Sequence, residues 1–141
     1  MWIGLQKLHE VTRRDWKLEI ELTDWDNAKY KAIYNHFRVN DASSKFVLSI
    51  GGFDSSSTLG DAMAYHHGKK FSTYDHDNDG YSTGDCSNQY KGAGWWFYSC
   101  YRCMLNGGDY GKSTYSIRWN EPGNRVGTQT WKASTMKLIP K

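Results

Sequence analysis

Residues 75–80 read Asp75-His76-Asp77-Asn78-Asp79-Gly80, and the rest of the sequence is best interpreted outward from this stretch. Carboxylates at every second position, followed by glycine, are typical of a loop that wraps oxygen ligands around one hard cation such as calcium. An EF-hand would need a bidentate Glu at the twelfth loop position, where this chain has Cys86, and no helical pattern flanks the segment. The pattern therefore predicts a calcium loop of another kind, completed by backbone carbonyls a few residues on; a solvated acidic turn is the alternative.

The cysteines lie just downstream of this loop. There are three, Cys86, Cys100 and Cys103, and an odd number in a secreted module implies one pair plus a leftover thiol. A Cys86–Cys100 disulfide would close the acidic loop from its far side and stabilise it by about 3 kcal/mol. In a cytosolic protein the Cys-x-x-Cys spacing of Cys100 and Cys103 would instead suggest redox chemistry or half a zinc site. That interpretation is disfavoured because no βαβ pattern surrounds the pair and no second Cys-x-x-Cys occurs.

Aromatic residues crowd the same region. Trp95 and Trp96 stand directly before Phe97, and at least one of the two tryptophans is expected in the core. The tyrosines nearby could line a pocket for small apolar groups that carry one polar handle. They are Tyr90, Tyr98, Tyr101, Tyr110 and Tyr115.

Toward the N-terminus the pattern becomes regular. Residues 3–12 have the spacing of a short amphipathic helix, and residues 16–22 alternate apolar and charged side chains, as in a strand with one wet face. Residues 28–39 predict a second strand with a bulge, and residues 45–50 predict a third, which Gly51-Gly52 would end. Strands joined by short polar turns favour an antiparallel meander.

The C-terminal segment 135–139 alternates again and is expected to return to the sheet. Between Gly52 and residue 128 almost no periodic segment occurs, which is improbable in a compact domain unless the region is functional or stapled. The protein is therefore interpreted as α+β, an antiparallel-rich sheet with short helices followed by a loop-rich subdomain. Residues 1–73 with 129–141 would form the sheet subdomain, and residues 74–128 the calcium- and ligand-binding one.

Composition excludes several classes of function. Apolar residues make up 38% of the 141 residues and aromatics 16%, which is enough for one core and argues against disorder. The net charge of +3 comes from 18 basic and 15 acidic residues that are spread along the sequence, so a nucleic-acid partner is not expected. No apolar run approaches the roughly 20 residues of a membrane span, and no signal peptide is visible.

The ordered motifs of the whole sequence are similar to one family. Trp2-Ile3-Gly4-Leu5-x-x-Leu8-His9, the Gly60–Asp79 segment, Gly94-Trp95-Trp96, Leu105-Asn106-Gly107 and the terminal Met136–Pro140 resemble, in this order, the characteristic segments of fibrinogen-related domains. Members include ficolins, tachylectins, tenascins, angiopoietins and the fibrinogen chains. The resemblance implies their fold, secretion to the extracellular space, and a calcium ion beside a recognition pocket.

The resemblance also implies roles for particular residues. The calcium ligands would be the side chains of Asp77 and Asp79 and the carbonyls of Tyr81 and Thr83, and Cys86 would pair with Cys100. The Ser99–Cys100 peptide would be cis and present backbone donors to an acetyl group. The pocket residues would be Tyr90, Ser99, Cys100, Tyr101 and Tyr115.

Departures from the family pattern leave three points open. The family's N-terminal subdomain is not visible before Met1, so an exposed sheet edge with apolar surface is expected, and oligomers would form through upstream regions or through Cys103. The Gly80–Asp85 segment is one residue longer than usual. This leaves open whether the carbonyl of Thr83 or that of Gly84 would be the calcium ligand. Cys103 stands where a serine-like residue is usual. It would be a free thiol, form an interchain cross-link or compete with Cys100 for the bond to Cys86. The Asp109–Trp119 loop is also shorter than usual.

Two functions follow from these observations, and enzymatic activity is not expected. The first is a calcium-dependent, lectin-like module that binds acetylated sugars or other acetyl-bearing ligands. The alternative is a protein-interaction module of the tenascin or angiopoietin type, which binds a receptor or matrix protein. The histidines His66, His67 and His76 near the acidic loop show no nucleophile–base spacing, and His66 and His67 are expected to be structural or surface residues.

Overall fold

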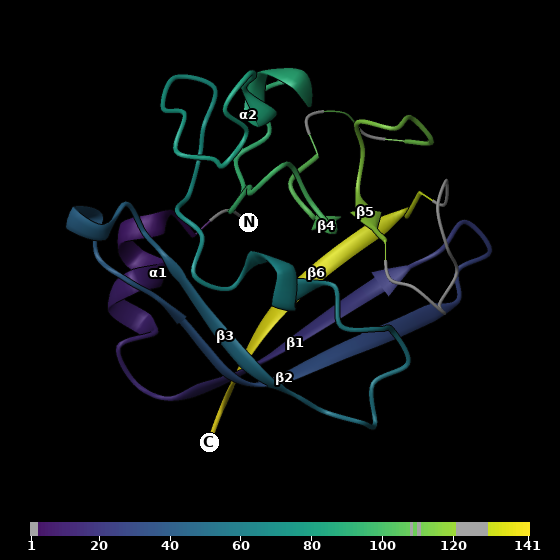
Figure 1. Ribbon diagram of the computed structural model, residues 1–141. Coiled ribbons are helices and arrows are strands. Elements are labelled where there is room, and N and C mark those ends of the chain that lie inside the picture. Colours follow the sequence, from purple (N-terminus) through teal and green to yellow (C-terminus); the bar gives the residue numbers. More distant parts are fainter. Residues whose placement is uncertain (1–2, 108, 110, 121–129) are drawn as a thin grey trace.

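A computed structural model describes residues 3–107, 109, 111–120 and 130–141. Its main element is a four-stranded antiparallel sheet in the order β3-β2-β1-β6, and β4 pairs with β5 in a small second sheet. Figure 1 shows the loop-rich region, with α2, β4 and β5, on one side of the sheet and α1 at one end. The elements are α1 Leu5–Val11, β1 Trp16–Thr23, β2 Lys29–Val39, η1 Ala42–Ser44, β3 Leu48–Phe53, η2 Met63–His66, α2 Cys86–Gln89, β4 Cys103–Met104, β5 Arg118–Trp119 and β6 Ala133–Pro140.

The central strand β1 follows the alternation of its sequence. Leu18, Ile20 and Leu22 are fully buried, as a strand with one core-facing side requires. Glu19 lies between two neighbouring strands, where it forms ion pairs with Lys31 of β2 and Lys137 of β6 at 3.4 and 3.2 Å. Such cross-strand pairs each contribute about 0.2–1 kcal/mol. The predicted helix, the first two strands and the C-terminal strand are thus confirmed.

The predicted third strand is wrong in its bounds. Lys45 and Phe46 have φ values of 62° and 56°, a left-handed conformation that no strand accommodates, so β3 begins only at Leu48. The glycine pair does not end the strand, because Gly51 pairs with His36 and Phe53 with Tyr34. Glycine often marks the end of a strand, but here the pairing of β3 with β2 continues past Gly51 and Gly52 to Phe53.

One core joins the sheet to the loop-rich region. Trp95, Trp119 and Trp131 from the loop-rich half and the C-terminal region are almost fully buried in the same cluster as the β1 side chains. Trp96 is buried as well and donates its indole N–H to the carbonyl of Phe46 at 2.8 Å. Both tryptophans of the pair are therefore core residues.

Strand β6 forms the edge of the described sheet. Most of its residues are exposed or half-buried, and Met136 is 36% exposed. This agrees with the exposed edge and apolar surface expected from the sequence.

Candidate functional site: an acidic loop beside an aromatic cavity

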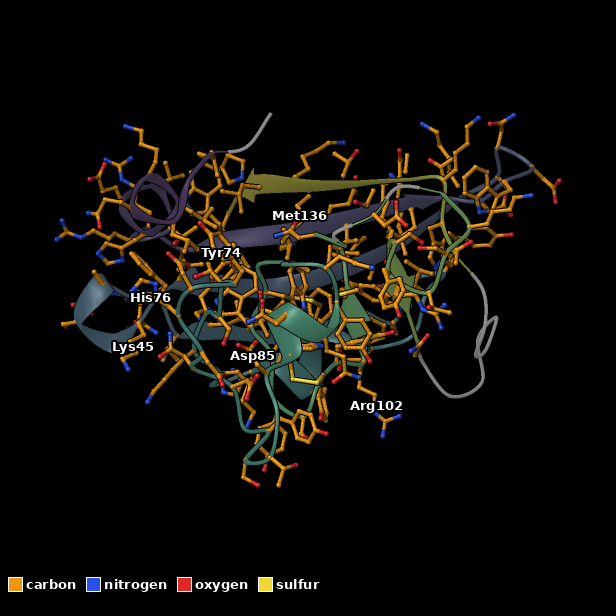
Figure 2. The ribbon with its side chains drawn as sticks, turned by 90° about the horizontal axis from the view of Figure 1, so that it is seen from above. Lys45, Tyr74, His76, Asp85, Arg102 and Met136 are labelled. Atoms are coloured by element: carbon orange, nitrogen blue, oxygen red, sulfur yellow. A yellow bond between two sulfur atoms is a disulfide. The ribbon has the colours of Figure 1, made fainter. Side chains whose placement is uncertain are left out.

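A disulfide anchors the candidate site to the core. Cys86, fully buried at the start of α2, is bonded to Cys100, and their Cα atoms are 5.6 Å apart. The bond encloses residues 86–100, and the chain-entropy model gives a stabilisation of about 3 kcal/mol for a loop of this length. In Figure 2 this disulfide lies beside α2, close to the labelled Asp85.

Three carboxylates converge in front of this disulfide. Oxygen atoms of Asp77, Asp79 and Asp85 all lie within 4.8 Å of one another. Asp79 is fixed by two backbone donors, the N–H of Tyr81 and the N–H of Cys86, both at 2.8 Å. The sequence expectation named Asp77 and Asp79 but missed Asp85.

A tight turn brings Asp85 back to the other two carboxylates. The N–H of Gly84 donates to the carbonyl of Tyr81 at 3.2 Å, which reverses the backbone between them. A Cβ at position 84 would lie 2.3 Å from the Tyr81 ring, so only glycine permits this approach. Thr83 is exposed in the same turn.

Asp75, the first carboxylate of the alternating run, does not join the cluster. Its carboxylate accepts a hydrogen bond from Thr73 Oγ1 at 2.7 Å and lies 3.3 Å from His76 Nδ1. The hydrogen bond from Thr73, followed by the contact with His76, lowers the pKa of Asp75. By contrast, burial and then the charge of Asp77 raise the pKa of Asp79, although two backbone N–H groups counteract this.

The donor set of the loop fits a hard divalent cation. Carboxylate and carbonyl oxygens are the ligands of calcium, and three carboxylates within this distance repel one another unless a cation lies between them. Asp77, Asp79 and Asp85 would supply side-chain oxygens, and the turn that contains Tyr81 and Thr83 would supply carbonyls. When bound, the ion would offset most of this negative charge and hold the turn in place.

An open cavity of about 390 Å³ lies next to this loop. Four of the predicted ligand-binding residues line it: Tyr90, Ser99, Cys100 and Tyr101. The remaining lining residues are Tyr81, Gln89 and Asn120, of which Tyr81 was predicted only as a metal ligand. Gln89 lies at the end of α2, one turn from Cys86, and Asn120 follows β5, so neither shows a sequence pattern that marks it as a wall residue.

The tyrosine rings pack against one another at the cavity. The Tyr90 ring makes an edge-to-face contact with Tyr101, with centroids 5.0 Å apart. Burial raises the pKa of Tyr90, so its hydroxyl stays protonated. Tyr115 was expected among the pocket residues, but it does not line the cavity. The centroid of its ring lies 6.2 Å from that of Tyr90, and Lys91 Nζ lies 5.1 Å from the centroid of the Tyr115 ring. Tyr110 lies outside the described residues.

The Ser99–Cys100 peptide bond is cis, as the resemblance implied. The N–H of Ser99 donates to the Tyr65 hydroxyl at 3.3 Å and the N–H of Tyr98 donates to the Cys100 carbonyl at 2.9 Å. The N–H groups of Cys100 and Tyr101 have no hydrogen-bond partner within the described part of the molecule. Two backbone donors thus remain available in the segment that forms the cavity wall.

A buried histidine holds this wall in position. His66 is fully buried; its Nδ1 donates to the Trp96 carbonyl at 2.8 Å, and its Nε2 accepts from the N–H groups of Arg102 and Cys103, both at 3.2 Å. These partners require the neutral ring with its proton on Nδ1. Burial lowers the pKa of His66 to about 4. The structural role expected for this residue is confirmed.

Cys103 lies inside the core and not on the surface. Its side chain is fully buried, with Sγ 3.2 Å from the Met63 sulfur, and burial raises its pKa. Of the three possibilities left open by the sequence, the free thiol is therefore the one observed. The interchain cross-link is wrong for the folded protein, because a partner's thiol cannot reach this sulfur.

The comparisons with known proteins agree in their description of this protein. The family model "Fibrinogen beta and gamma chains, C-terminal globular domain" matches residues 1–141. Tenascin-R of Gallus gallus is 43% identical over 121 residues, which cover 84% of this chain and 8% of that protein. Among solved structures, the fibrinogen-like globe domain of human ANGPTL6 has a TM-score of 0.86 at 31% identity, with 99% of this chain and 64% of that one covered.

A second solved structure is lamprey fibrin D-dimer in complex with the peptide ligand Gly-His-Arg-Pro-amide. It has a TM-score of 0.85 at 32% identity, with coverage of 99% and 50%. The chain thus spans less than two thirds of each of these proteins. None of the described helices combines the length and apolar character needed to cross a bilayer.

Proposed function

Because this protein belongs to the family of the C-terminal globular domains of fibrinogen beta and gamma chains, we propose that it is a secreted, non-enzymatic recognition module. It binds a peptide segment of a protein partner at the aromatic cavity, and calcium in the neighbouring loop keeps that cavity in shape. Secretion is supported by the Cys86–Cys100 disulfide, since such bonds persist in oxidising compartments.

The observation that carries this proposal is the composition of the cavity wall. Tyr81, Tyr90 and Tyr101 line an open depression together with the polar side chains of Gln89, Ser99 and Asn120. Tyrosine is enriched at the centres of protein interfaces because it combines a large contact area with one polar group. The lamprey fibrin structure, a complex with a peptide ligand, supports a peptide as the ligand class.

Panning tests this function without knowledge of the partner. A phage-displayed peptide library is selected on immobilised wild-type protein in millimolar calcium, and the enriched peptides are measured against a Tyr90→Ala/Tyr101→Ala variant. We expect the enriched peptides to bind the variant at least tenfold more weakly. A Tyr30→Ala variant, altered at a half-buried ring of the sheet, is the matched control. Peptides that bind all three proteins equally would refute the role of the cavity.

An acetyl-bearing ligand is the second candidate, and one observation favours it. The N–H groups of Cys100 and Tyr101 lack protein partners among the described residues, and an acetyl carbonyl would accept from such donors. Retention on an N-acetylglucosamine resin, with elution by free acetate or N-acetylglucosamine, would support this ligand. Passage of the folded, calcium-loaded protein through the resin would exclude it.

A further inference from the structure

A cluster of cations and aromatic rings lies beside the cavity, on residues that the proposed site does not use. Tyr98 is 43% exposed, and Lys69 Nζ lies 3.9 Å from the centroid of its ring. Tyr65 contacts Tyr98 edge-to-face at 5.8 Å, and the guanidinium carbon of Arg102 lies 5.7 Å from the centre of the Tyr65 ring. We call these four residues, Tyr65, Lys69, Tyr98 and Arg102, the Tyr98 patch.

The patch is held in a defined arrangement next to the cavity. Tyr98 and Arg102 flank the wall residues Ser99, Cys100 and Tyr101 in the sequence. The backbone of Arg102 is fixed on both sides, since its N–H donates to His66 and its carbonyl accepts from the N–H of Asn120 at 2.7 Å. Its side chain is exposed, and Figure 2 shows the labelled Arg102 pointing away from the body of the molecule.

The positive charges of the patch are not balanced by carboxylates. Lysines on the sheet face, such as Lys29, Lys31 and Lys137, form ion pairs with glutamates. Lys69 and Arg102 form none with any carboxylate in the described residues. The acidic loop passes close to Tyr98, since Gly80 lies against its ring, but the carboxylates of that loop face one another. Calcium in the loop would offset most of their negative charge.

We propose that the Tyr98 patch binds an acidic segment of the polypeptide partner, next to the part of the partner that enters the cavity; this inference rests on the proposed function. Lys69 and Arg102 would attract aspartate or glutamate carboxylates, and the faces of Tyr65 and Tyr98 would contact their aliphatic stems. A dense polyanion such as a sulfated glycan is less well matched, because the patch has two separated cations and not a continuous basic stripe.

The test uses fluorescein-labelled poly-L-glutamate of about 20 residues as the probe, measured by fluorescence anisotropy at low salt with calcium present. We expect a Lys69→Gln/Arg102→Gln variant to bind the probe about tenfold more weakly than wild type, and wild-type binding to weaken as salt rises. An Arg13→Gln/Arg14→Gln variant is the matched control: it makes the same change in charge at two exposed arginines that form no described ion pair. We expect this control to bind within twofold of wild type.

Three outcomes would overturn the proposal. Wild type and the patch variant could bind poly-L-glutamate equally well, or the control variant could lose as much binding as the patch variant does. The third is a patch-dependent affinity that is stronger for heparin than for poly-L-glutamate. Near-ultraviolet circular dichroism and the urea midpoint verify that each variant is folded.

The cavity variant Tyr90→Ala/Tyr101→Ala separates the two proposals. If its binding of poly-L-glutamate is retained while no panned peptide depends on the cavity, the patch is supported and the proposed function fails. If wild type and the Lys69→Gln/Arg102→Gln variant bind poly-L-glutamate equally, the inference about the patch fails. This holds even if the panned peptides do depend on the cavity.

Discussion

Replacement of His66 by glutamine is expected to remove a pH-dependent part of the stability of this fold. The neutral ring donates to the Trp96 carbonyl and accepts from two backbone N–H groups, those of Arg102 and Cys103. Protonation of Nε2 would point a new N–H at these two donors and place a charge in the core, close to Lys69. The folded protein therefore resists protonation of this residue, and the unfolded protein does not.

The magnitude follows from the two pKa values. In the folded protein the pKa of His66 is lowered by burial to about 4, against 6.5 in the unfolded state. Below pH 6.5 the unfolded state therefore binds a proton that the folded state does not, and stability falls as the pH decreases. At about 1.4 kcal/mol for each pH unit, the folded state loses about 3 kcal/mol between pH 6.5 and 4. This is a large part of the roughly 5–15 kcal/mol that stabilises a typical domain.

Urea unfolding of wild type and His66→Gln, followed by tryptophan fluorescence from pH 7.5 to 4, measures this contribution. We expect the variant to be less stable at pH 7.5 and the difference between the two proteins to shrink by about 3 kcal/mol toward pH 4. Carboxylates titrate in both proteins, so their contribution cancels in the difference. Parallel curves for wild type and His66→Gln would refute the reasoning.

The remaining predictions concern the acidic loop and the buried thiol. Calcium at about 100 times its dissociation constant should add about 2.7 kcal/mol to the free energy of unfolding and raise the melting temperature by roughly 5–10 °C. The Asp77→Ala substitution should abolish this rise. A wild-type melting curve that a chelator leaves unchanged would remove the metal from the proposal. Asp85→Asn should weaken calcium binding about tenfold in isothermal titration, whereas Asp75→Asn, at a carboxylate outside the cluster, should not; equal effects would contradict the role of Asp85. Cys103 should react with Ellman's reagent only after unfolding in urea, and a fast reaction in the native protein would contradict its burial.

Several features of this protein could be predicted from the sequence because they depend on local order along the backbone. The alternation of residues 16–22 identifies β1, since neighbouring side chains of a strand face opposite sides whatever the rest of the fold does. The short spacing of Asp77 and Asp79 indicates an oxygen-rich loop in the same way. The ordered motifs from Gly60 to Pro140 identify the family, and with it the Cys86–Cys100 pair and the cis bond before Cys100.

Other features were decided by tertiary structure, because they depend on where the backbone turns back. Asp85 joins Asp77 and Asp79 in the carboxylate cluster because the turn at Gly84 folds onto the Tyr81 ring. The start of β3 was misjudged because the left-handed backbone at Lys45 precedes a segment whose composition alone suits a strand.

The wall of the cavity and the patch beside it combine residues that are far apart in the sequence. Asn120 joins the wall from beyond β5, and Lys69 and Tyr98 meet across almost thirty positions. His66 is identified as the support of this wall only once the carbonyl of Trp96 and the N–H of Cys103 lie against its ring. Hydrogen bonds and ring contacts act over a few ångströms in space, and no pattern of spacing along the sequence records which distant residues come that close.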